Sequence, residues 1–235
     1  MQDFSAALGE AFRLLAGLDA DLVEIVTLSL QVSLGAVLLA ACIGLPLGAM
    51  LGVTRFPGRQ AAIIFLNALM GLPPVVVGLT VYLLLSRAGP LGWMGLLYTP
   101  QAMIIAQTVL VTPIIAALTR QTVEDLKSEY HEQLTVFGVG PAAAVATLLW
   151  DARYSLVTGL LAGFGRAVAE VGAVIIVGGN INHVTRVMTT AIALETSRGD
   201  LALALGLGII LVSISVAVNA LVSALRLTAE RSAYA

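Results

Sequence analysis

Long apolar runs, separated by short polar segments, fill most of the chain. A helix needs about 20 apolar residues to cross about 30 Å of hydrocarbon, and five segments meet this requirement. They are roughly Val26 to Val53, Ala61 to Leu85, Ala102 to Leu118, Ser155 to Gly178, and Leu201 to Leu225. The pattern predicts an all-α integral membrane protein in which residues 26–235 form a transmembrane domain of about five spans.

Two stretches outside these runs are also expected to be helical. Within the N-terminal interfacial segment, residues 1–25, the stretch from Phe4 to Leu18 has the pattern of an amphipathic helix on the membrane surface, and a frayed tail is the alternative. The segment from Asn180 to Asp200 mixes polar residues with VMTTAIALE, which suggests a helix that dips into the outer interface or lies on it.

Composition agrees with a polytopic membrane protein. Hydrophobic residues make up 59% of the chain and charged residues 11%, and the mean hydropathy is +0.98. A formal net charge of -2 provides no basic field for nucleic acid. The single cysteine, Cys42, cannot form an internal disulfide, and His131 and His183 fall in loops on opposite sides of the membrane. No metal site is therefore expected.

Basic residues beside the spans indicate the orientation, because cytoplasmic loops retain Lys and Arg. Seven share one side: Arg55, Arg59, Arg120, Lys127, Arg153, Arg226 and Arg231. Four face the other: Arg13, Arg87, Arg186 and Arg198. The bias favours a multi-pass protein of the plasma (inner) membrane with its N-terminus outside and its C-terminus in the cytoplasm.

The cytoplasmic loop at residues 121–152 is too long for a simple turn. It is predicted to hold two short helices that meet at Gly138-Val139-Gly140-Pro141, because glycine permits the turn and proline suits the first turn of a helix. With Glu129 and Glu132 on its first helix, the loop suits docking into a groove of a soluble partner. A solvated connector is the alternative.

The spacing in this loop resembles the "EAA" loop of ABC-importer permeases. Glu132 is followed six positions later by Gly138, and the apolar pair Leu148-Leu149 comes ten and eleven positions after that glycine. Gln133-Leu134 replaces the two small residues of the pattern, and Trp150-Asp151 replaces its closing Leu-Pro.

Other stretches resemble the molybdate, tungstate and sulfate permeases, and the tungstate-type branch most closely. They are GLPPVVVGLTVYLLLSRAGPLG, GFGRAVAEVGAVIIVGGNI, TPQAMIIAQTVLVTPIIAAL and WDARYSLVTG, so the likeness covers most of the chain after about Leu28. It implies the transmembrane domain of a type I ABC importer that moves a tetrahedral oxyanion, tungstate in the closest branch, by alternating access.

The resemblance also implies partners: a second copy of the chain, two cytoplasmic ATPase subunits, and an extracytoplasmic oxyanion-binding protein, all at a lipid membrane. It makes Glu132, Gly138 and the neighbouring turn residues the element that couples to the ATPase. The sequence has no glycine loop followed by a phosphate-binding lysine, so ATP and Mg are expected in the partner ATPase, and this chain is not expected to be an enzyme or to hold a cofactor.

Two prolines interrupt the second span and make it the first candidate for a gate. Pro73-Pro74 removes backbone donors, and the exposed carbonyls must be satisfied by protein or by a watery path, which would place Val77 near that path. Thr112 before Pro113 in the third span offers a similar kink and a hydroxyl that could satisfy a freed carbonyl or line the path. A kink with packing value only is the alternative.

Arg166 and Glu170 lie inside the fourth span, four residues apart, so a continuous helix would put them on one face. A charge at mid-bilayer costs on the order of 2.5 to 3.5 kcal/mol on insertion scales, so the two must be paired or hydrated. Three roles stay open: a polar lock between helices near the pore, direct contact with the oxyanion on the translocation path, and a hinge or subunit interface.

Rival functions follow from the same residues. A molybdate, sulfate or vanadate permease would use the same machine, because anion choice lies mainly in the binding protein. An ion-coupled carrier or channel working without an ATPase would use Arg166 and Glu170 as a relay, and it leaves the 32-residue loop without a purpose. A membrane scaffold that transports nothing is the third rival.

Overall fold

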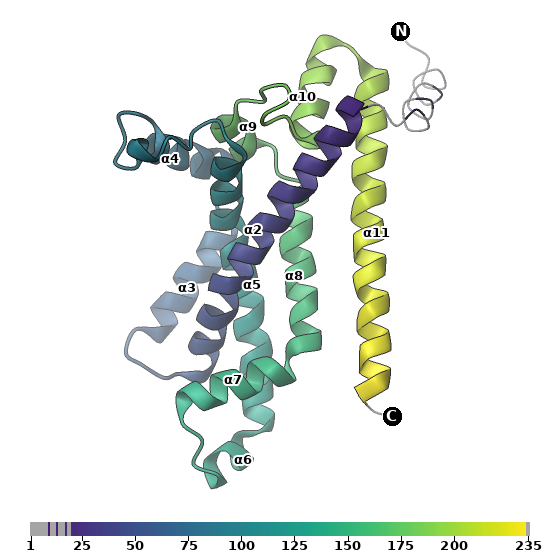
Figure 1. The fold of residues 1–235 in the computed structure, drawn as a ribbon. Coiled ribbons are helices and arrows are strands. Elements are labelled where there is room, and N and C mark those ends of the chain that lie inside the picture. The colour runs from purple at the N-terminus through teal and green to yellow at the C-terminus, as the bar shows by residue number, and fades with distance from the viewer. Residues whose placement is uncertain (1–8, 10–12, 14–16, 18–19, 234–235) are drawn as a thin grey trace. The chain divides into compact units, whose positions relative to one another are not determined.

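The computed structural model describes residues 20–233, together with Gly9, Arg13 and Gly17, and it describes side chains as far as Ala224. Most of the predicted N-terminal interfacial segment therefore lies outside the described residues. Every element in the described part of the chain is a helix (Figure 1). The elements are α2 (Ala20–Val53), α3 (Arg59–Met70), α4 (Pro74–Leu85), the 3-10 turn η1 (Gly92–Met94), α5 (Pro100–Glu129), α6 (His131–Val136), α7 (Pro141–Asp151), α8 (Arg153–Val168), α9 (Gly172–Gly178), α10 (Met188–Arg198) and α11 (Leu201–Ala233).

Three continuous helices, α2, α5 and α11, are long and apolar enough to cross a membrane. They confirm the first, third and fifth predicted spans. α5 runs eleven residues past the expected end at Leu118, because the sequence between Pro113 and Gly138 contains neither proline nor glycine. An ion pair between Arg120 and Glu124, 2.5 Å long and one helical turn apart, supports this extension.

The second and fourth predicted spans are broken. The break at Pro73-Pro74 in the second span was predicted, whereas the prediction of the fourth span as one continuous helix was wrong. α3 and α4 meet at a bend of 99°, and α8 and α9 at a bend of 58°. At about 1.5 Å of rise per residue, α4 is roughly 18 Å long and α9 roughly 10 Å, and both are too short to cross alone. Within the described residues, the number of candidate spans is five if each bent pair counts as one.

The chain divides into two compact units, and each takes one end of α2, α5 and α11. Unit 1 comprises residues 1–35, 73–107 and 167–220, and unit 2 comprises residues 36–72, 108–166 and 221–235.

Within unit 1, α4 packs directly against α9. Gly78 permits this contact, because a Cβ at that position would lie 2.7 Å from the Cα of Ala173. Gly172, at the start of α9, lies similarly close to Val75 of α4. The two short helices are therefore held together by a close approach of their backbones.

Within unit 2, a row of small residues on α2 lies against α5. A Cβ on Gly48 would meet the carbonyl oxygen of Ala116 at 2.3 Å, and one on Gly52 would meet that of Arg120 at 3.1 Å. Further along, α2, α5 and α7 share a buried cluster formed by Ala49, Val53, Val123, Ala144 and Leu148.

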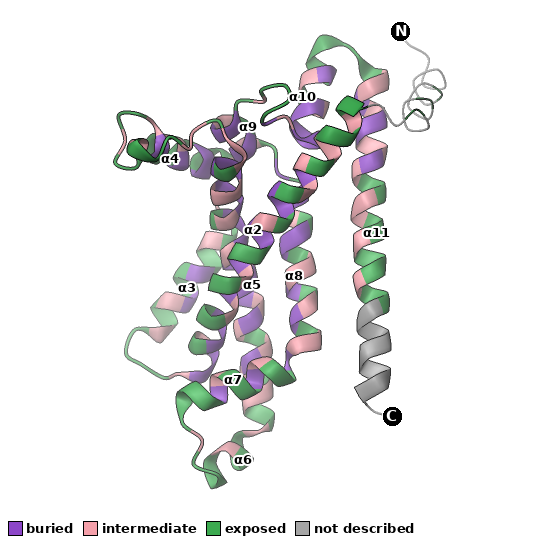
Figure 2. Ribbon diagram, viewed as in Figure 1, coloured by how far each residue is buried: buried purple, intermediate pink, exposed green. Residues whose placement is uncertain are grey.

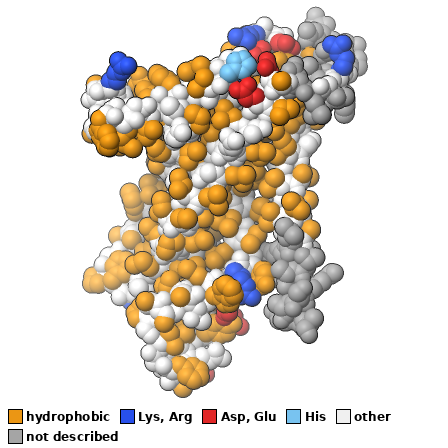
Figure 3. Space-filling model, in the orientation of Figure 1, with side chains coloured by type: hydrophobic (Ala, Val, Ile, Leu, Met, Phe, Trp, Pro, Cys, Tyr) orange, Lys and Arg blue, Asp and Glu red, His pale blue; other side chains and the backbone are white. Residues whose placement is uncertain are grey.

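Large apolar side chains are exposed along the helices in a way that suits lipid. Figure 3 shows hydrophobic side chains over most of the visible face. The described part of α11 is mostly exposed or half-exposed (Figure 2), and it presents Val212, Val216 and Leu221 outward. In a soluble protein a surface of this kind would drive aggregation, whereas hydrocarbon solvates it.

Candidate functional site

The break between α8 and α9 is organised by Glu170. This residue lies in the non-helical stretch between the two helices, and only 5% of it is exposed. Its Oε1 accepts a hydrogen bond from the backbone N–H of Ala173 at 3.0 Å. The carboxylate thus satisfies a free donor at the start of α9, the end of a helix that favours negative charge.

Side chains from two other helices satisfy the backbone carbonyls at this break. Nε2 of Gln107, on α5, donates to the carbonyl of Ala167 at 3.0 Å, and the hydroxyl of Thr189, on α10, donates to the carbonyl of Glu170 at 2.8 Å. Because buried backbone carbonyls must find donors, these contacts allow the helix to end inside the protein. We call Gln107, Glu170 and Thr189 the break triad.

Arg166 occupies the last turn of α8 and is half-buried. A cation at the C-terminal end of a helix is favourable. The prediction that Arg166 and Glu170 share one face of a continuous helix was wrong, because α8 ends at Val168 and Glu170 follows that end. The reason is local: the Glu170 carboxylate serves the start of α9.

The proline break in the second predicted span is confirmed. Pro73 is extended and Pro74 is the first residue of α4, where the missing N–H costs nothing. The carbonyl of Pro73 accepts from the N–H groups of Val76 and Val77. Val77 is buried on α4, whereas Pro73 is exposed. The assignment of these residues to a gate stays a prediction.

The hydroxyl of Thr112 binds a different carbonyl from the one expected. Its hydroxyl donates to the carbonyl of Thr108 at 2.7 Å, one turn back, whereas the carbonyl deprived of a donor by Pro113 is that of Val109. α5 continues through this point without interruption. The hydroxyl therefore does not serve the carbonyl freed by the proline.

The turn in the loop at residues 121–152 is confirmed. α6 ends in a turn at Gly138, whose φ is +61°, and the N–H of Val139 donates to the carbonyl of Leu134. Gly140 is extended, and Pro141 begins α7. The placement of both glutamates on one short helix was wrong, because Glu129 is the last residue of α5 whereas Glu132 lies in the first turn of α6.

The sequence reasoning missed the apolar tip of this loop. Val136 and Phe137 are 82% and 79% exposed, beside the Gly138 turn at the end of α6. Exposed aromatic and apolar side chains at such a turn are candidates for a protein-binding surface. The signal was present as the apolar pair in TVFGVG within an otherwise polar segment.

A further ionic contact lies in the loop after α9. Nδ1 of His183 lies 2.8 Å from Oε2 of Glu24, on α2, and this hydrogen bond, together with the negative charge of Glu24, raises the pKa of His183 above its usual value. Asp21 brings a third ligand atom within 4.8 Å of the other two. All three side chains are exposed.

Comparison with known proteins gives consistent matches. Residues 44–231 match the family described as binding-protein-dependent transport system inner membrane component. A "Probable anion ABC transporter permease protein" of Haloferax volcanii is 42% identical over 87% of this chain and 90% of its own. The tungstate uptake system permease protein TupB of Peptoclostridium acidaminophilum is 40% identical over 92% and 95%. The protein of the same name from Campylobacter jejuni is 41% identical over 57% and 56%.

Proposed function

The chain belongs to the family of binding-protein-dependent transport system inner membrane components, and from this premise we propose that it is the pore subunit of an ATP-driven tungstate importer. The observation that carries the proposal is the 40% identity to a tungstate uptake permease over nearly the whole of both chains. The relative from Haloferax volcanii, named for anion transport, is equally similar in length and identity. As a permease the chain is not itself an enzyme.

The proposed complex contains two copies of this chain, two ATPase subunits that bind ATP and Mg, and an extracytoplasmic binding protein that delivers the oxyanion. The exposed tip at Val136 and Phe137, with Gly138 fixing its turn, supports an ATPase docking site. The orientation that goes with it has the N-terminus outside and the C-terminus in the cytoplasm.

The proposed mechanism is alternating access. ATP binding draws the two docking loops together, and the loaded binding protein and the ATPase each favour one of two states of the permease, since only differential affinity can shift such an equilibrium. Arg166 and Glu170 act as a polar lock beside the translocation path, and Pro73, Pro74, Val77 and Thr112 border its gate. The buried, hydrogen-bonded Glu170 supports a lock more than a direct oxyanion contact.

The test is ATP hydrolysis by the reconstituted complex with binding protein loaded with tungstate, molybdate or sulfate. We expect tungstate-loaded protein to stimulate hydrolysis most, and Gly138→Trp to abolish the stimulation while the subunits still assemble in detergent. Equal stimulation by molybdate or sulfate would contradict tungstate specificity. No stimulation by any loaded binding protein would contradict the importer.

A further inference from the structure

A basic pocket lies within unit 2, where α2 ends and α3 begins beside the last turns of α5. Its volume is about 410 Å³, and it is lined by Gly52, Arg55, Arg59, Glu124, Lys127, Ser128 and His131. The break triad, the proline break and the apolar loop tip contribute no residue to it.

The contacts of the pocket hold two cations in fixed positions. Nε of Arg59 donates to the carbonyl of Leu51 at 2.8 Å, and Nζ of Lys127 donates to the carbonyl of Val53 at 2.6 Å. Both carbonyls belong to the last turn of α2, where positive charge is favourable. These bonds leave further N–H groups of both side chains available to a ligand.

The one carboxylate among the lining residues is already engaged. Glu124 forms ion pairs with both Arg59 and Arg120. The pocket therefore contains three cations, Arg55, Arg59 and Lys127, and one carboxylate. The two oxygens of that carboxylate already pair with two different guanidinium groups. Like charges brought together in this way leave a site that an additional anion would stabilise.

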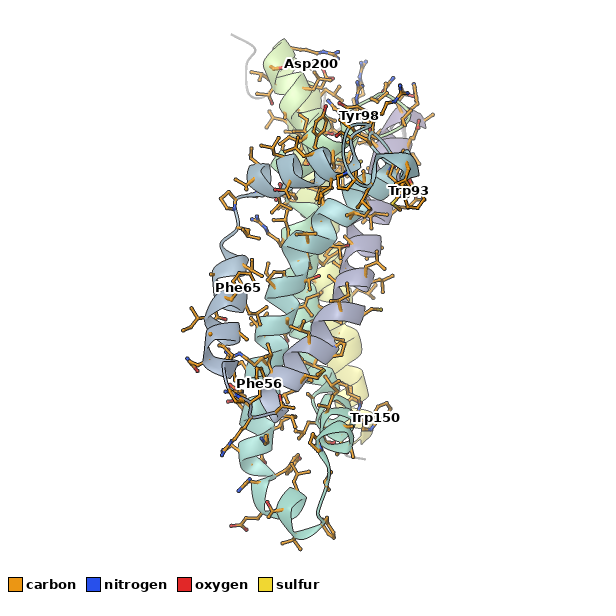
Figure 4. All side chains as sticks on the ribbon, turned by 90° about the vertical axis from the view of Figure 1, so that its left-hand side faces the viewer. Phe56, Phe65, Trp93, Tyr98, Trp150 and Asp200 are labelled. Atoms are coloured by element: carbon orange, nitrogen blue, oxygen red, sulfur yellow. The ribbon has the colours of Figure 1, made fainter. Side chains whose placement is uncertain are left out.

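Apolar surface borders the pocket. Phe56 follows Arg55 in the loop, and Phe65 projects from α3 (Figure 4); both are exposed, as is Ile64, which precedes Phe65 in the sequence. The pocket also lies at the ends of two helices that qualify as membrane spans. A cationic pocket beside exposed apolar side chains at a span end has the two halves of a phospholipid site, one for the headgroup and one for the acyl chains.

We propose that the basic pocket binds a phosphoryl anion, supplied by the headgroup of an anionic phospholipid in the adjacent leaflet. Arg55 and Arg59 offer paired N–H groups that match phosphoryl oxygens, and Lys127 adds a point charge. Occupancy would neutralise the excess positive charge at the junction of α2, α3 and α5. The site is independent of the transported anion and of the identity of the ATPase.

The experiment titrates the full-length permease in detergent with phosphatidylglycerol and with phosphatidylcholine, and measures bound lipid by native mass spectrometry. Arg55→Gln removes an exposed cation of the pocket, and Arg87→Gln, an exposed arginine in unit 1, is the matched control. We expect phosphatidylglycerol to bind more tightly than phosphatidylcholine, Arg55→Gln to weaken that binding about fivefold, and Arg87→Gln to leave it unchanged.

Inorganic phosphate separates the two sources of the anion. Binding of phosphatidylglycerol that depends on Arg55 and resists excess phosphate supports the lipid headgroup, and phosphate protection against heat that depends on Arg55 supports a free anion in the same pocket. Equal affinity for both lipids with no effect of phosphate would overturn the proposal. So would an Arg55→Gln defect confined to binding of the ATPase subunit, because the pocket would then be a protein interface.

Discussion

Three side-chain hydrogen bonds from the break triad hold the backbone between residues 167 and 173, where the helical ladder is interrupted. Glu170 accepts a hydrogen bond from an N–H group of α9, while Gln107 and Thr189 donate hydrogen bonds to two carbonyls. The sequence indicated only Glu170, because a carboxylate inside an apolar run is conspicuous. Gln107 and Thr189 lie 60 and 19 residues along the chain from the carbonyls that they bind. A local sequence pattern cannot predict contacts between residues so far apart in the chain.

Thr189→Val tests the contribution of one member of the triad. The substitution keeps the shape of the side chain and deletes its hydrogen bond to the carbonyl of Glu170. Hydrogen bonds between helices in membranes contribute about 0.6 to 1.7 kcal/mol, and we expect a loss of unfolding free energy in that range. Thermal unfolding of the purified permease measures it. Thr196→Val, which deletes an exposed bond within α10, is the control, and equal losses in both variants would contradict the role of the triad.

The pair of His183 and Glu24 predicts a dependence on pH. Because Glu24 raises the pKa of His183 above 6.5, the folded state binds the proton more tightly than the unfolded state. The resulting stabilisation is fully present below pH 6.5 and is lost as the pH rises through the raised pKa. The difference in unfolding temperature between wild type and His183→Gln should therefore shrink with rising pH. His131→Gln is the control, and a constant difference would contradict the ion pair.

At the scale of elements, the breaks in the second and fourth spans differ in how far the sequence revealed them. Pro73-Pro74 predicted the first break, because proline inside a helix removes a backbone hydrogen bond and disrupts the helix. The second has no proline, and GFGRAVAEVGAV reads as one amphipathic helix until Glu170 is seen to cap α9. Hydropathy did not predict the extension of α5 to Glu129, because it falls at the end of the apolar run. The helix itself continues beyond that point.

Gly78→Leu tests the packing of α4 on α9. A side chain at this position would collide with the backbone of Ala173, and we expect a loss of about 1 to 3 kcal/mol in unfolding free energy. Gly165→Leu, on α8 where a Cβ would meet nothing within 4 Å, is the matched control and should be nearly neutral. Thermal unfolding compares the two, and a stable Gly78→Leu variant would show that the contact is loose.

For the whole molecule, the fold class and the family could be predicted from the sequence because apolar length and a few spaced motifs specify them. The candidate docking site rests on two kinds of observation. Glu132 and the Gly138 turn are candidates from their spacing, whereas Val136 and Phe137 became candidates only when their exposure was known.

Phe137→Glu tests the docking tip in the complete complex. Aromatic hot spots at interface centres contribute about 2 kcal/mol or more, so we expect the affinity of the permease for its ATPase subunit to fall by about thirtyfold. Trp93→Glu is the control, since Trp93 is equally exposed in η1, outside the docking loop. Binding of purified ATPase to immobilised permease measures the effect. Equal affinities of Phe137→Glu and wild type would remove the tip from the interface.

Tungstate uptake into proteoliposomes that contain this permease, with binding protein outside and ATP inside, tests the importer most directly. We expect accumulation that requires the ATPase subunits and ATP, and that Gly138→Trp abolishes. Uptake at the same rate by the permease alone, without ATPase subunits, would refute the importer and make Arg166 and Glu170 the first residues to examine for a carrier mechanism.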